Sequence, residues 1–72
     1  MKPNVKKLND LVKEKFNGNK SAFANALGLD RAQVSKVLKD GTCAGAQFYG
    51  ALYVFCEKEK LDFRDYIFYL KV

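Results

Sequence analysis

The sequence predicts an all-α fold, a compact bundle of about five short helices forming one domain over residues 1–72. A chain of 72 residues suffices for one small domain. Its apolar residues recur every three to four positions, without the clear two-residue alternation typical of strands. Glycine, asparagine and aspartate separate these segments. Hydrophobic residues make up 49% and charged residues 29% of the chain, a composition that excludes intrinsic disorder.

The first helix is expected over about residues 4–16. Asn17 and Gly18 should end it, because both tolerate the left-handed backbone of a helix C-cap. The apolar residues of this segment fall on one stripe, which consists of Val5, Leu8, Val12 and Phe16.

Two further helices should follow, joined by a tight turn. Asn19 is a good N-cap for a helix over Lys20–Leu27, and Gly28 can supply the positive φ of the turn. Asp30 is the expected N-cap of a third helix over about residues 31–39, which stops near Asp40-Gly41.

The third helix should have one buried and one exposed face. Val34, Val37 and Leu38 form the buried face. At about 100° per residue, Ala32 and Lys36 point almost directly away from it. Gln33 lies three positions after the cap and can complete a capping box with Asp30. Gln33 therefore serves either this box or a contact with a ligand.

A fourth helix is expected over about residues 44–58, followed by a short fifth helix after Asp62. Gly50 inside the fourth helix costs about 1 kcal/mol relative to alanine, and this cost suggests close backbone packing. Residues 66–72 either finish the fifth helix or form an extended strand. The fourth helix has two adjacent apolar faces, one with Phe48, Leu52 and Phe55 and one with Tyr49, Tyr53 and Cys56.

Charge is distributed unevenly along the chain. The net charge is +5, which favours an anionic partner. Residues 1–41 contain nine lysines and arginines against four acidic residues, whereas residues 42–72 contain four of each. Eight of the ten aromatic residues lie in the second part. The first part is therefore the expected binding face, and the second the expected core or protein interface.

Several classes of protein are disfavoured by missing residue types. The chain has no histidine, so no imidazole can activate Cys43 or Ser35, and we expect neither an enzyme nor a metal or other cofactor. Cys43 and Cys56 are too few for a disulfide framework and are expected to be small apolar residues. No secretion signal is visible, and the longest mostly apolar run, Phe48–Cys56, is shorter than the roughly 20 residues that span a bilayer. A cytoplasmic protein is expected.

The segment Lys20–Gly41 has the spacing of a helix-turn-helix motif. It resembles the motif of Cro/CI-type (XRE-like) transcription regulators of phages and bacteria. The resemblance implies a lambda repressor-like DNA-binding domain, and a single-domain, Cro-like regulator of phage or mobile-element origin. The matching residues are Phe23-Ala24, Leu27-Gly28-Leu29, Val34-Ser35, Val37-Leu38 and Gly41.

The resemblance also implies roles for individual residues in binding double-stranded DNA, with residues 31–39 in the major groove. Arginine and lysine suit the O6/N7 edge of guanine, and Ala32 can touch a thymine methyl group. Base contacts are expected from Arg31, Ala32, Gln33, Ser35 and Lys36. Phosphate contacts are expected from Lys20, Lys39 and Thr42. A homodimer through the fourth and fifth helices and the C-terminal tail is expected on an operator-like, palindromic site.

Alternatives stay open at several positions. Thr42 either contacts a phosphate or caps the fourth helix. The lysines of the first helix, Lys6, Lys7, Lys13 and Lys15, are most simply its solvated face. Tyr49, Tyr53, Tyr66 and Tyr69 belong to the core or a dimer contact rather than to a surface that stacks on single-stranded bases. The rival function is a small helical protein-interaction module, an antirepressor or a partner-binding subunit, that does not bind DNA.

Overall fold

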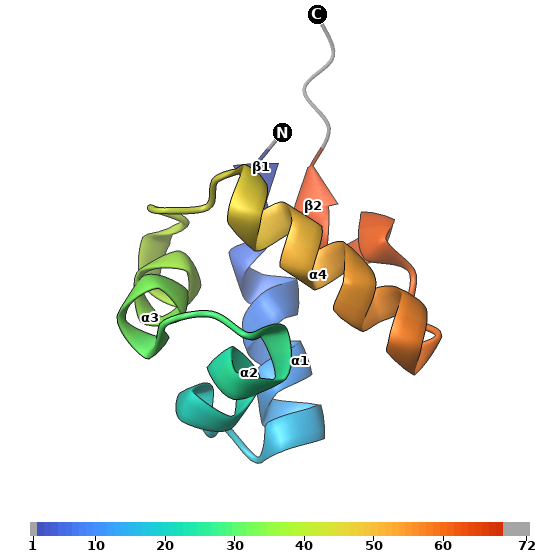
Figure 1. The fold of residues 1–72 in the computed structure, drawn as a ribbon, viewed down its shortest axis with the longest axis horizontal. Coiled ribbons are helices and arrows are strands. Elements are labelled where there is room, and N and C mark those ends of the chain that lie inside the picture. Colours follow the sequence, from blue (N-terminus) through green and yellow to red (C-terminus); the bar gives the residue numbers. More distant parts are fainter. Residues whose placement is uncertain (1, 69–72) are drawn as a thin grey trace, which may run out of the picture.

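The computed structural model describes residues 2–68, and four α-helices make up most of this part of the chain (Figure 1). They are α1 (Val5–Phe16), α2 (Lys20–Leu27), α3 (Arg31–Asp40) and α4 (Ala46–Glu59). The predicted helical class is confirmed. The expected fifth helix is a single 3₁₀ turn, η1 (Phe63–Tyr66), so the count of five helices was wrong. Within the described residues, no helix has the length and apolar character needed to cross a membrane.

Side-chain caps explain where the first three helices begin. The Asn4 side chain accepts a hydrogen bond from the Lys7 backbone N–H at 3.3 Å, and Asn19 accepts one from Ala22 at 3.1 Å. Asp30 accepts one from the Ala32 N–H at 3.3 Å. Each bond satisfies an N–H that has no partner inside its own helix. The predicted starts of α1, α2 and α3 are confirmed.

The same three helices end at residues with a left-handed backbone. Asn17 has φ 53°, Gly28 has φ 71° and Gly41 has φ 84°. Asparagine and glycine adopt this conformation more readily than other residues. The chain therefore reverses at these positions, as the sequence predicts.

One apolar core lies between the helices. Three phenylalanine rings pack together here: the partly buried Phe16 lies 5.6 Å from Phe23 and 5.9 Å from Phe55, measured between ring centroids. Phe23 meets Phe55 edge-on at 6.1 Å. These rings come from α1, α2 and α4, so they join the two parts of the sequence. The buried apolar residues are Leu8, Leu11, Val12, Phe23, Ala24, Leu27, Val34, Val37, Leu38, Phe48, Leu52, Phe55, Cys56 and Ile67.

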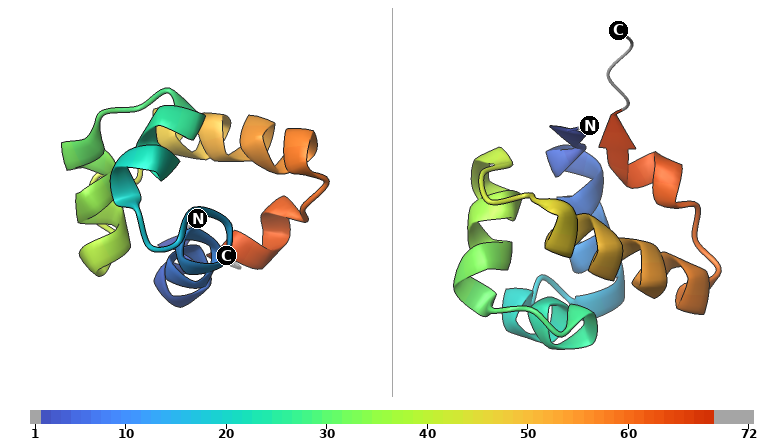
Figure 2. Two further views of the ribbon diagram at one scale, coloured as in Figure 1. Left: turned by 90° about the horizontal axis from the view of Figure 1, so that it is seen from below. Right: turned by 45° about the horizontal axis from the view of Figure 1, so that its top comes forward.

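A short antiparallel strand pair joins the two ends of the described chain (Figures 1 and 2). Strand β1 (Lys2–Pro3) pairs with β2 (Ile67–Phe68), in the register Lys2 to Phe68 and Pro3 to Ile67. The Asn4 N–H extends this contact by donating to the Tyr66 carbonyl at 2.9 Å. Of the two alternatives for the tail, residues 67–68 form the strand, and residues 69–72 lie outside the described part.

Two residues of the second part differ from expectation. Gly50 is exposed, and a Cβ atom built on it would meet nothing within 4 Å, so the expected close packing against the rest of the chain is wrong. Cys43 is exposed and has φ 66°, so it is not a core residue. Cys56 is buried as expected, and this burial, assisted by Asp62, Asp65 and Glu57, raises the pKa of its thiol to about 11.

Candidate nucleic-acid interface

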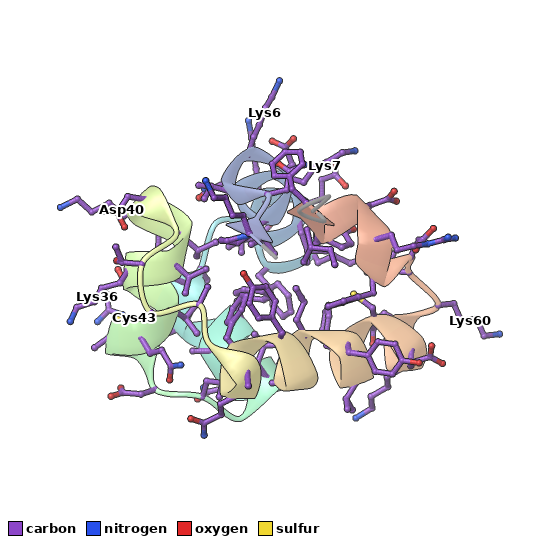
Figure 3. All side chains as sticks on the ribbon, turned by 90° about the horizontal axis from the view of Figure 1, so that it is seen from above. Lys6, Lys7, Lys36, Asp40, Cys43 and Lys60 are labelled. Atoms are coloured by element: carbon purple, nitrogen blue, oxygen red, sulfur yellow. The ribbon has the colours of Figure 1, made fainter. Side chains whose placement is uncertain are left out.

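Helix α3 presents one face to the core and the opposite face to solvent. Val34 and Val37 are fully buried and Leu38 is 3% exposed, which confirms the predicted inner face. The outer face contains the exposed residues Ala32, Lys36 and Lys39, and Arg31 is exposed at the N-terminal end of the helix, nearer the edge of the buried face. Figure 3 shows Lys36 pointing away from the body of the molecule. We call these four residues the α3 outer face.

The turn between α2 and α3 fixes the angle at which α3 leaves the core. The Gly28 N–H donates to the Asn25 carbonyl at 3.1 Å, and the Leu29 N–H donates to the Ala24 carbonyl at 2.9 Å. Phe23 and Ala24 are buried beneath this turn, in the same cluster as the inner face of α3. These contacts leave α3 little freedom to rotate about its own axis, because rotation would expose its buried valines.

A side-chain tether holds the other end of α3. The Asn9 amide on α1 donates to the Leu38 carbonyl at 2.8 Å and to the Val5 carbonyl at 2.9 Å. The Leu38 carbonyl is one of the last four of α3, which have no N–H partner within the helix. Sequence reasoning missed this residue. Its only signal was a polar side chain beside the apolar stripe of α1.

The amide of Gln33 links α3 to the loop that follows it. Its Nε2 donates to the Cys43 carbonyl at 3.4 Å, and the side chain is half-buried. The predicted capping box is therefore wrong, since the N-cap bond at Asp30 goes to Ala32 and the Gln33 amide turns toward residue 43. A base contact by Gln33 would compete with this hydrogen bond.

Thr42 does not cap α4. The N-cap of α4 is Gly45, which makes no side-chain hydrogen bond. The Thr42 hydroxyl instead donates to the Asp40 carboxylate at 2.7 Å, and the Thr42 N–H donates to the same oxygen at 3.0 Å. These two bonds lower the pKa of Asp40. A phosphate contact from the Thr42 hydroxyl would have to break the shorter bond.

The basic groups of the site form no salt bridge within residues 2–68, although Lys39 interacts electrostatically with the neighbouring Asp40. Lys20, at the start of α2, is exposed, as are the charged residues of the α3 outer face. Among residues 2–68, neither Lys20 nor Arg31, Lys36 or Lys39 forms an ion pair with an acidic side chain. Ser35 is half-buried, at the border between the two faces of α3. The first-helix lysines Lys6, Lys7, Lys13 and Lys15 are all exposed.

The tyrosines lie outside this basic surface. Tyr49 and Tyr66 are half-buried against the core, and burial raises the pKa of each phenol. Tyr53 is 51% exposed, and its ring meets that of Phe63 edge-on at a centroid distance of 5.5 Å. The described tyrosines thus pack against other side chains of the protein, and Tyr69 lies outside the described residues.

No protein-family model, curated protein or solved structure matches this chain. What the site can do therefore follows from its own residues and geometry. Two of its properties matter most: hydrogen bonds hold α3 at both ends, and its exposed positive charges form no salt bridge within the described residues. The site is thus a helix whose inner face is packed in the core and whose exposed side carries lysine and arginine side chains.

Proposed function

We propose that this protein is a sequence-specific, double-stranded DNA-binding transcription regulator with a helix-turn-helix, similar to Cro/CI-type (XRE-like) regulators. The α3 outer face is the observation that carries the proposal. Its positive charges are exposed and unpaired, while the opposite face of the same helix is locked in the core. The proposal implies a lambda repressor-like DNA-binding domain and a cytoplasmic protein of phage or mobile-element origin.

In this proposal α2 and the Gly28 turn position α3, and α3 enters the major groove. The groove is about 12 Å wide and accepts one helix. Arg31 and Ala32 lie in the first turn and Lys36 lies just over one turn later, so all three can reach adjacent base pairs. Lys36 and Arg31 suit guanine, and Ala32 suits the thymine methyl group. Ser35 and Gln33 lie on the two sides of the α3 outer face.

Phosphate contacts would set the register of α3 on the duplex. Lys20 and Lys39 are exposed lysines at the start of α2 and in the last turn of α3, where they can meet phosphates beside the groove. Thr42 contributes only if its hydroxyl leaves Asp40. Such contacts supply affinity without sequence preference.

A homodimer would give the protein enough base contacts for specificity. One α3 reads only a few base pairs, and two copies on half-sites about 34 Å apart are the usual solution. The charge-neutral part of the chain, with α4, η1 and the tail, is the expected dimer surface. A two-fold dimer would require a palindromic operator.

Selection from a random duplex library, followed by titration of the selected duplex at several salt concentrations, tests the proposal. We expect one enriched sequence, and an affinity that falls with salt at a log–log slope of about −0.9 per phosphate contacted. Failure to bind any duplex at low salt would refute DNA binding.

The rival proposal is a protein-interaction module, favoured by exposed apolar side chains. Tyr53, Val54 and Phe68 are 51%, 62% and 54% exposed. A ¹H–¹⁵N correlation titration with duplex DNA separates the two proposals. Shifts at residues 30–39 support DNA binding. An unperturbed spectrum, together with shifts at Tyr53 and Phe68 on adding a protein partner, supports the rival.

A further inference from the structure

The connection between α1 and α2 contains a dipeptide that can react with itself. Asn17 is followed by Gly18, whereas the other asparagines precede residues with side chains: Asn4, Asn9, Asn19 and Asn25. Glycine has no Cβ atom, so its backbone nitrogen can approach the side-chain carbon of the residue before it. Both Asn17 and Gly18 are exposed, so water reaches the reacting atoms. The sequence thus allows deamidation at Asn17 more readily than at any other asparagine of the chain.

The reaction is deamidation through a cyclic imide. The Gly18 nitrogen forms a bond with Cγ of Asn17, and the bond between Cγ and Nδ2 breaks. The proton of the Gly18 nitrogen passes through water to the side-chain nitrogen, which leaves as ammonia. Water then opens the five-membered ring, at Cγ to give aspartate or at the main-chain carbonyl carbon to give isoaspartate. Nothing is oxidised or reduced, and the product carries one more negative charge.

The folded end of α1 holds the reacting atoms apart. Asn17 has a left-handed backbone, with φ 53° and ψ 33°. Ring formation needs Cβ of Asn17 to eclipse the Gly18 nitrogen across the bond between Cα and the carbonyl carbon. At a tetrahedral Cα, a ψ of 33° instead places these two atoms on nearly opposite sides of that bond. Attack therefore requires a large rotation of ψ at Asn17.

A hydrogen bond opposes this rotation. The Gly18 N–H donates to the Val12 carbonyl at 3.0 Å, which is the bond that closes a Schellman cap at the end of a helix. Rotation of ψ at Asn17 swings the Gly18 N–H away from Val12 and so breaks the bond. The ring of Phe16, which packs 5.6 Å from that of Phe23, anchors the same turn to the core. The rate of deamidation should therefore follow how often the last turn of α1 opens.

We propose that Asn17 is a site of spontaneous deamidation under the control of the α1 cap, and that it is converted only in molecules whose last turn of α1 has opened. The inference does not rest on DNA binding. The new carboxylate lies at the C-terminal end of α1, where the helix dipole disfavours negative charge. Isoaspartate also adds a methylene group to the main chain, so the bond from Gly18 to Val12 cannot re-form with its original geometry. Conversion thus makes a transient opening permanent.

The effect should extend to the start of α2, because Asn19 belongs to both turns. Its backbone N–H donates to the Phe16 carbonyl at 2.9 Å, and its side chain accepts a hydrogen bond from the Ala22 N–H at 3.1 Å. A displaced Gly18 would move Asn19 with it. The converted chain should therefore lose the C-cap of α1 and weaken the N-cap of α2.

The first test follows Asn17 by mass spectrometry of its peptide, after incubation of the full chain in buffer and in concentrated guanidinium chloride at one mildly alkaline pH. We expect conversion in the unfolded chain, and conversion at least about tenfold slower in the folded chain. Asn17→Gly retains a residue that suits the left-handed cap and should abolish the mass change. Equal rates in the two solutions would overturn control by the cap. An unfolded chain that is not converted at Asn17 would overturn the site.

The second test separates opening of this turn from unfolding of the whole chain. Phe16→Ala removes the ring that anchors the turn, and Val37→Ala removes a fully buried side chain of α3 as the control. The two variants are compared at denaturant concentrations that give them the same free energy of unfolding. Phe16→Ala should be converted at least about fivefold faster. Equal rates would show that global unfolding controls the reaction and would overturn the proposal.

The third test concerns the product. Converted chain separates from wild type on cation exchange by its lower positive charge, and it should melt at a lower temperature than unconverted chain from the same incubation. A product that melts like the unconverted chain would overturn the inference that conversion makes the opening permanent.

Discussion

Residues 2–41 and residues 42–68 are built by different means. In the first part, three helices begin at side-chain caps and end at left-handed asparagine or glycine. In the second part, α4 begins at Gly45 without a side-chain cap and ends at Lys60, a non-glycine residue with φ 59°. Side-chain caps therefore define every helix of the first part, whereas in the second part only the short turn η1 begins at one, Asp62.

The two parts also present different surfaces. The first exposes unpaired lysines and Arg31 on a helix held at both ends, and the second exposes Tyr53, Val54 and Phe68. Affinity for a polyanion and affinity for another protein surface are thus separated along the chain. A surface substitution in one part should therefore leave the binding affinity of the other part unchanged. Substitutions in the core that joins the two parts are the exception.

The largest effect is expected where the two parts meet, at Phe23. Phe23→Ala removes a fully buried ring that contacts both Phe16 and Phe55, and should destabilise the protein by about 3–5 kcal/mol. Urea denaturation followed by circular dichroism measures this change. Phe68→Ala, in which the lost ring is 54% exposed, is the control and should cost far less. Similar losses in the two variants would show that the core does not join the two parts.

The next effect concerns the basic surface of the first part. Lys36→Ala should reduce the free energy of binding to the selected duplex by about 1–3 kcal/mol and relax the sequence preference of the protein. Lys39→Ala should weaken binding to all duplexes and reduce the magnitude of the salt slope by about 0.9. Fluorescence anisotropy on selected and scrambled duplexes measures both. Lys58→Ala, at an exposed position of α4, is the control and should change neither the sequence preference nor the salt slope. If all three variants bind alike, α3 is not the recognition helix.

A smaller effect is expected from the tether between α1 and α3. Asn9→Ala leaves the Leu38 carbonyl without its 2.8 Å donor and should destabilise the protein by about 1–2 kcal/mol. Thermal or urea unfolding measures it. Asn25→Ala, at an exposed asparagine of α2, is the matched control and should be nearly neutral. Equal values for the two variants would rule out a structural role for the tether.

The smallest effect is a pH dependence at the end of α3. The hydrogen bonds from Thr42 hold the pKa of Asp40 below its usual 3.8. A depressed folded-state pKa contributes stability above the unfolded value, and this contribution is lost as the pH falls through the folded value. Thr42→Val should therefore raise the pKa of Asp40, as measured by NMR titration of its carboxyl carbon. An unchanged titration would show that Thr42 does not hold Asp40.

Sequence reasoning found α2 and α3 almost residue by residue, because their caps Asn19 and Asp30 act within one helical turn of themselves. It placed α1 from its apolar stripe and did not identify the cap Asn4. It was less successful after residue 41. The start of α4 was placed two residues early, near Ala44, since no side-chain cap marks it. The 3₁₀ turn was taken for a helix because Asp62 does cap it. The strand pair joins residues more than sixty positions apart, and no local pattern announces such a contact.

The candidate site divides in the same way. The exposure of Ala32 and Lys36 followed from helical periodicity alone. The partners of Gln33 and Thr42 did not, because each depends on the path of the loop after α3. The tether from Asn9 was also missed, since it joins positions 29 residues apart.

The strand pair reaches as far as the proposed reading helix. Pro3 pairs with Ile67, and its Cγ would lie 3.2 Å from a Cβ atom placed on Gly41, the residue that terminates α3. Gly41 is therefore confined by its own left-handed backbone and also by the proline beside it. The last turn of α3 therefore lies against the β1–β2 strand pair. Separation of the two strands would remove a packing contact from the end of α3, where Lys39 lies.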